Sequence, residues 1–208
     1  MNEQDVSYAA RLEIEYPERL DRLTTFLRLL WAIPIFMIFA LVGGGGTVAS
    51  GDTTTSAGGS IVGGLAVATA LMIAFRQRYP RWWFDFLLAL TRFESRVGVY
   101  LALMRDEYPS TEDEQAVHLE LDYPDAQRLN RWLPLVKWLL AIPHYIVLAF
   151  LILGALIAII VAWFAILVTG RYPRGLFDYL VGVGRWALRV QAYAFFMLTD
   201  RYPPFSLR

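Results

Sequence analysis

The sequence predicts an all-α integral membrane protein with four transmembrane helices. We expect these helices to form two repeated hairpins, each followed by an amphipathic helix at the bilayer surface. Three observations lead to this prediction: long uncharged stretches, an internal repeat, and the placement of the basic residues. A transmembrane helix needs about 20 apolar residues. The chain has 208 residues, of which 57% are hydrophobic, and its segments 29–75 and 138–170 contain only one charged residue, Asp52.

The internal repeat divides the chain into two similar halves. Arg-Tyr-Pro-Arg-Trp-Trp-Phe-Asp at 78–85 returns as Arg-Tyr-Pro-Arg-Gly-Leu-Phe-Asp at 171–178. Leu-Glu-Ile-Glu-Tyr-Pro at 12–17 returns as Leu-Glu-Leu-Asp-Tyr-Pro at 119–124. Self-similarity at a fixed spacing indicates repeated structural units. We therefore expect a first repeat at 1–109 and a second at 110–208, each with two spans and one interfacial helix.

All 19 lysines and arginines lie within 11–28, 76–137 and 171–208. Basic residues favour the cytoplasmic side of a membrane protein. This distribution predicts a multi-pass protein of the cell (inner) membrane with both termini and the centre in the cytoplasm. The extracytoplasmic parts would be the Gly- and Thr-rich loop near 43–60 and a tight turn near Gly154.

The elements follow in chain order. Alternating apolar and acidic residues near 12–16 and 119–123 fit two short cytoplasmic strands that could pair. The first hairpin is expected to have spans at about 23–42 and 57–75. The apolar block 133–169 would reach ~55 Å as one helix, longer than the ~30 Å bilayer core, so we divide it into two spans near Gly154.

After each hairpin, the segments 81–104 and 174–197 are expected to form amphipathic interfacial helices. One stripe of each carries an aspartate and two arginines at helical spacing. These residues, with the arginines of the Tyr-Pro motifs, are candidates for lipid-headgroup contact: Arg78, Arg81, Asp85, Arg92, Arg96, Arg171, Arg174, Asp178, Arg185 and Arg189. The alternative is a solvated helix face with a structural role.

Arg28 and Lys137 are equivalent in the repeat, because each stands six positions before a proline, Pro34 or Pro143. Long basic side chains near a helix end ordinarily reach toward the membrane surface. The sharper hypothesis places both charges along a crevice between the two repeats.

The sequence carries no recognisable catalytic or cofactor motif. It has no cysteine, and we expect no metal, no cofactor and no nucleic-acid partner. We therefore expect a non-enzymatic scaffold or accessory subunit of a membrane complex, whose partners are anionic membrane lipids and a membrane protein or a second copy of the chain. The alternative is a small transporter or channel with a crevice between the repeats. A third hypothesis, a lipid-headgroup enzyme using Asp85 and Asp178, lacks a nucleophile or metal set.

The doubled Arg-Tyr-Pro-Arg-x-x-Phe-Asp motif resembles a bacterial membrane family known as domain of unknown function 4389. The resemblance covers roughly 12–203 as two copies. It implies a bacterial origin and a cytoplasmic-membrane location, and it implies no activity.

Overall fold

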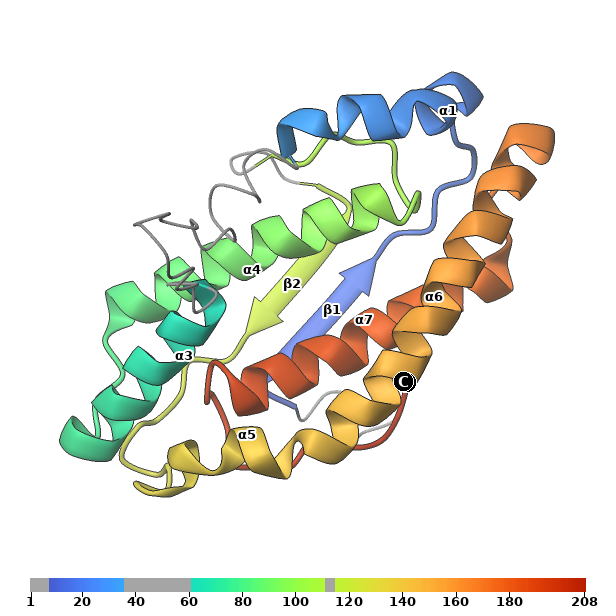
Figure 1. Cartoon of the computed structure of the whole chain (residues 1–208). Coiled ribbons are helices and arrows are strands. Elements are labelled where there is room, and N and C mark those ends of the chain that lie inside the picture. Colours follow the sequence, from blue (N-terminus) through green and yellow to red (C-terminus); the bar gives the residue numbers. More distant parts are fainter. Residues whose placement is uncertain (1–7, 36–60, 111–114) are drawn as a thin grey trace, which may run out of the picture.

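The computed structural model describes residues 8–35, 61–110 and 115–208, and Figure 1 shows their arrangement. Helices α4 and α7 lie beside a two-stranded sheet, and the remaining helices surround them. The elements are β1 (Ala10–Ile14), α1 (Arg22–Trp31), α3 (Ile61–Leu71), the π-helical turn η1 (Met72–Arg76), α4 (Arg81–Leu101), β2 (Val117–Leu121), the 3-10 turn η2 (Leu133–Leu135), α5 (Lys137–Leu140), α6 (Ile142–Thr169) and α7 (Arg174–Ala194).

The sheet consists of β1 and β2, paired antiparallel with Leu12 opposite Leu119. Side chains of a strand alternate between its two faces. The face that carries Leu12 and Leu119 is buried against α4 and α7, whereas Glu13, His118 and Glu120 are exposed on the other. The expected strand pair is therefore confirmed, with both strands starting two residues earlier than expected.

Helix α7 separates the sheet from α6. On one side, the Arg185 Nε donates a hydrogen bond to the Leu12 carbonyl oxygen. On the other side, the Tyr179 hydroxyl donates to the Leu151 carbonyl oxygen and the Trp186 Nε1 donates to the His144 Nδ1. Successive residues of an α-helix are rotated by about 100°, which puts these two sets of contacts on different faces of α7. The order of layers is thus sheet, α7, α6.

Helix α6 corrects the expected second hairpin. It runs unbroken from Ile142 to Thr169, so the prediction of a turn near Gly154 is wrong. The block 133–169 is shortened at its start instead, because η2 and α5 form separate short elements. Gly154 has a packing role: a Cβ there would lie 2.6 Å from the Tyr179 hydroxyl oxygen.

Within the described residues, α6 is the one helix long and apolar enough to cross a membrane. The expected first hairpin, with spans at 23–42 and 57–75 and a loop at 43–60, is described only at 23–35 and 61–75, because 36–60 lie outside the described residues. Four transmembrane helices are therefore not part of the fold that the structure describes.

Helices are present at the expected segments 81–104 and 174–197, as α4 and α7, and their position at a bilayer surface stays a prediction. Both begin directly after the proline of a Tyr-Pro pair, Pro80 or Pro173, which has an extended conformation. The chain turns away soon after each helix ends, at a residue with a positive φ: Leu103 (63°) after α4 and Met197 (58°) after α7. A positive φ is uncommon for residues with a side chain, so its recurrence at near-equivalent positions shows that the two halves share a backbone feature.

Candidate functional site

The arginines of the two stripes hold the sheet. The Arg92 Nε donates a hydrogen bond to the Leu119 carbonyl oxygen at 3.2 Å, and the Arg185 Nε donates to the Leu12 carbonyl oxygen at 2.9 Å. Arg92 belongs to the first predicted repeat and Leu119 to the second, whereas Arg185 and Leu12 reverse this order. Each half therefore binds the strand of the other half.

The second arginine of each stripe binds the irregular segment that follows its own helix in the chain. Arg96 donates to the Ser110 carbonyl oxygen. Arg189, which is buried, donates to the carbonyl oxygens of Ser206 and Arg208. Asp85 and Asp178 are exposed, and no ion pair between either of them and a stripe arginine is formed in the described part of the chain. Lipid-headgroup contact by these residues stays a prediction, and the contacts give the four arginines a structural role.

The Arg-Tyr-Pro-Arg motifs make crossed contacts of the same kind. The Arg81 guanidinium lies 4.8 Å from the ring centre of Tyr123, and that of Arg174 lies 4.4 Å from the ring centre of Tyr16. A cation over an aromatic face is attracted by the ring quadrupole. In addition, the Tyr123 hydroxyl donates to the Tyr79 carbonyl oxygen, and the Tyr16 hydroxyl donates to that of Tyr172.

Arg28 and Lys137 lie in two separate buried ion pairs, one in each half. Arg28 pairs with Asp106 and also donates to the Tyr100 and Arg105 carbonyl oxygens, both at 2.8 Å. Its side chain is 2% exposed. A buried cation needs a carboxylate and further hydrogen bonds to offset its desolvation, and Arg28 has both.

The second pair repeats this arrangement with a lysine. The Lys137 Nζ lies 2.7 Å from an Asp200 carboxylate oxygen and donates to the Thr199 carbonyl oxygen at 2.7 Å. Burial lowers the pKa of Lys137, and the bond to Asp200 opposes this shift. Each cation is thus paired within its own half, and a crevice lined by both Arg28 and Lys137 stays a prediction.

Sequence reasoning missed the two carboxylates of these pairs. Both stand in the same short motif, Asp-x-Tyr-Pro, as Asp106 before Tyr108 and Asp200 before Tyr202. Each also accepts a hydrogen bond from a backbone N–H. Asp106 accepts from Asp21, the residue before α1, and Asp200 accepts from Asn130, its counterpart in the second half. A search for repeated acids near the Tyr-Pro pairs would have found them.

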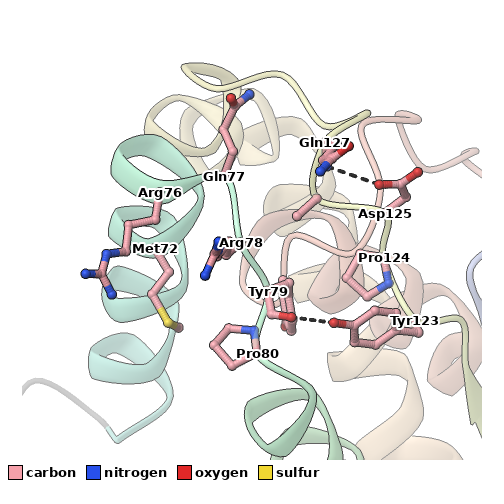
Figure 2. A pocket seen from close by; sticks show the side chains of 11 residues that line it. Met72, Arg76, Gln77, Arg78, Tyr79, Pro80, Tyr123, Pro124, Asp125 and Gln127 are labelled. Atoms are coloured by element: carbon pink, nitrogen blue, oxygen red, sulfur yellow. Dashed lines mark hydrogen bonds between the residues drawn. The ribbon is translucent and has the colours of Figure 1, made fainter.

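The largest described cavity encloses about 690 Å³ where η1 turns into α4 (Figure 2). We call it the Gln77 cavity. Gln77 is its turning residue, with a positive φ of 47°. The lining comes from two segments: Met72, Arg76, Gln77, Arg78, Tyr79 and Pro80 on one side, and Tyr123, Pro124, Asp125, Ala126 and Gln127 on the other.

His144 anchors the C-terminal segment. Its ring is buried and stacks on Phe205 with 4.0 Å between ring centres, and its Nδ1 accepts the Trp186 hydrogen bond. No group of three His, Cys, Asp or Glu side chains in the described ranges is placed to hold a metal ion.

Taken together, these features define a mostly helical domain with a small sheet and one strongly apolar helix. Residues 132–206 match the family model described as domain of unknown function (DUF4389). The match covers η2, α5, α6, α7 and most of the C-terminal segment, a part of the predicted second repeat at 110–208. Searches of curated proteins and of solved structures gave no match.

Proposed function

We propose that the protein is a non-enzymatic membrane protein, a scaffold or accessory subunit that docks on a lipid bilayer through α6. The observation that carries this proposal is the surface of α6. Only 22% of its most apolar 18-residue window is buried inside the structure. Phe150 is 72% exposed and Val168 is 76% exposed. Exposed apolar areas of this extent mark an interaction surface, and an uncharged helix of about 42 Å matches lipid better than water.

The layering supports a specific orientation. The outer face of the sheet is charged: Arg11 pairs with Glu120 at 3.1 Å and with Asp122 at 2.8 Å. Helix α7 lies between the sheet and α6, and the charged face is on the far side of the sheet. A bilayer that covers α6 therefore leaves the charged face in water. Charges at membrane depth are expensive. We therefore propose that the long axis of α6 lies within one leaflet and that the sheet faces the cytoplasm.

Anionic lipids are the partners that this orientation favours. The basic residues lie outside 138–170 and therefore outside α6. Basic residues near an anionic leaflet contribute about 1 kcal/mol each. The inner membrane of a bacterium, the proposed location, presents such a surface on its cytoplasmic side.

The described residues favour this role over transport or catalysis. Arg28 and Lys137 each bind a carboxylate of their own half, which supports a structural role for both charges. The largest described cavity is lined by arginine, tyrosine, proline, glutamine and apolar residues with one carboxylate, Asp125, a composition that suits binding.

Vesicle flotation tests the docking face with two variants that add the same residue. Phe150→Arg puts a charge on the exposed side of α6, where we expect a cost of about 2.5–3.5 kcal/mol and loss of flotation. His118→Arg puts the same charge on the exposed sheet face and is expected to float like the unchanged protein. Equal flotation of both variants would overturn the docking face.

Purification in mild detergent tests the accessory role. A stoichiometric membrane-protein partner is the expected result. A purified protein that moves solute across vesicle membranes would contradict it and favour the transporter alternative.

A further inference from the structure

We propose that the Gln77 cavity binds the phosphate group of an anionic phospholipid. This inference rests on the proposed membrane function and goes beyond it, because it names a site and the chemistry that the site recognises. Two arginines stand at the cavity, Arg76 at the end of η1 and Arg78 two residues later. Figure 2 shows the Arg78 side chain extending toward η1, and the Arg76 side chain extending along the outer side of η1 beside Met72.

Both guanidinium groups are available to a ligand. Arg76 and Arg78 are exposed, and neither forms an ion pair in the part of the chain that the structure describes. The stripe arginines, in contrast, are held by backbone carbonyl oxygens. Arginine binds phosphate through two parallel N–H donors, so two free arginines at one cavity form a fitting site for a phosphodiester.

The carboxylate of the cavity does not cancel this charge. One Asp125 oxygen accepts the Gln127 backbone N–H at 3.2 Å, and the other lies 3.2 Å from the Arg128 Nε. The remaining polar groups near the cavity are neutral, and its base is the hydrogen-bonded pair of Tyr79 and Tyr123 (Figure 2). The cavity therefore keeps a net positive rim.

The equivalent corner of the second half shows that the fold does not require this cavity. Gly170 replaces Gln77, and its carbonyl oxygen accepts the Leu20 backbone N–H at 3.0 Å. The Arg22 Nε lies 3.6 Å from where a Cβ of residue 170 would stand. Thr169 takes the place of Arg76. The two corners thus share a backbone turn, whereas the paired arginines and the cavity occur at the corner after η1.

A lipid, rather than a free phosphate, fits the surface that continues from the cavity. The outer side of α3 and η1 is apolar, with Val67 60%, Leu71 45% and Phe75 74% exposed. Phe75 precedes Arg76 directly, and Met72 lines the cavity. A phospholipid could place its phosphate between Arg76 and Arg78 and lay an acyl chain along this strip.

Native mass spectrometry of the full chain tests the site. The protein is released from mixed micelles of phosphatidylglycerol and phosphatidylcholine, and retained phosphatidylglycerol is counted. We expect one retained molecule per chain, and a loss of at least about tenfold in Arg76→Gln with Arg78→Gln, because the bidentate charge-assisted bonds are gone. The matched control is Arg19→Gln with Arg22→Gln, which removes two exposed arginines near Gly170 at the equivalent corner and is expected to retain the lipid.

A third variant, Met72→Trp, fills the cavity without changing charge and is expected to lose the lipid as well. Equal loss in the test and control pairs would overturn the site, since a general basic surface would then explain retention. Binding of inorganic phosphate alone, with no lipid retained, would overturn the lipid as its source. Failure of the unchanged protein to float with vesicles would overturn the proposed function. The micelle experiment would still report whether the cavity retains lipid.

Discussion

The two halves of the molecule agree in their interior and differ at their surface. Arg92 and Arg185 bind equivalent strand residues, and Tyr123 and Tyr16 bind equivalent motif residues. The corners after η1 and α6 differ, because one carries the Gln77 cavity and the other is joined by the Leu20–Gly170 hydrogen bond. Positions that hold the fold are repeated, and positions that depart from the repeat are where one half can have its own function.

The two buried ion pairs offer the strongest way to break this comparison. We expect Asp106→Ala and Asp200→Ala each to lower the free energy of unfolding by about 3–5 kcal/mol, because each leaves a buried cation without its carboxylate. Arginine stays protonated, whereas a buried lysine can lose its proton. Chemical unfolding in detergent at a series of pH values measures both variants.

The pH dependence separates them. Burial already lowers the pKa of Lys137, and the loss of Asp200 removes the group that opposes this shift. Below its lowered pKa, folded Asp200→Ala holds a costly charge. Its stability should therefore rise as the pH increases from that value toward the ordinary pKa of lysine. Asp106→Ala should show no such recovery. A parallel recovery in both variants would contradict the view that the two ion pairs are equivalent apart from the exchange of arginine for lysine.

The stripe arginines give the next largest effect. Arg185→Ala should cost about 1.5–3 kcal/mol, the range for hydrogen bonds from charged groups. Arg92→Ala should cost less, because Arg92 is exposed and Arg185 is half-buried. Thermal unfolding measures the cost, and flotation with anionic and neutral vesicles is the second readout. Unchanged stability with selective loss of anionic binding would show that lipid contact is their main role.

Gly182 and its counterpart Ala89 test a difference between the halves. A Cβ at Gly182 would lie 2.7 Å from the Leu207 carbonyl oxygen, so Gly182→Ala should displace the C-terminal segment and cost about 1–3 kcal/mol. The reverse change, Ala89→Gly, lies on an exposed position of α4 and should cost about 0.5–1 kcal/mol through helix propensity. Urea unfolding compares them, and equal costs would mean that the segment does not pack closely on α7.

Glu94 gives the smallest effect. It accepts a hydrogen bond from Gln191 at 3.4 Å and links α4 to α7. Burial raises the pKa of Glu94, so the folded protein holds the proton of the Glu94 carboxyl group more tightly than the unfolded chain does. Its contribution to stability is present below the ordinary pKa of glutamate and is lost as the pH rises through the raised value. Glu94→Gln should remove this slope, and an unchanged slope would assign it to another group.

Much of the fold could be predicted from local sequence patterns. The strand pair follows from the alternation of Leu12 and Glu13, and α4 and α7 follow from the helix-breaking Tyr-Pro pairs before them. Local patterns could not show that the helix continues through Gly154. A glycine that ends a helix and one that makes room for a neighbouring side chain, here Tyr179, look alike in a single sequence. The inward direction of Arg92 and Arg185 was also hidden, since it depends on strands from the other half.

The most direct test of the account is the membrane depth of α6 relative to the sheet. The chain has no cysteine, so a single nitroxide label can be placed at Ile142, Phe150, Val168 or Glu13 and its access to oxygen and to a water-soluble nickel complex measured in vesicles. We expect the three α6 positions to lie at similar depth in one leaflet and Glu13 to lie in water. A deep Glu13, or ends of α6 in opposite leaflets, would contradict the proposed orientation.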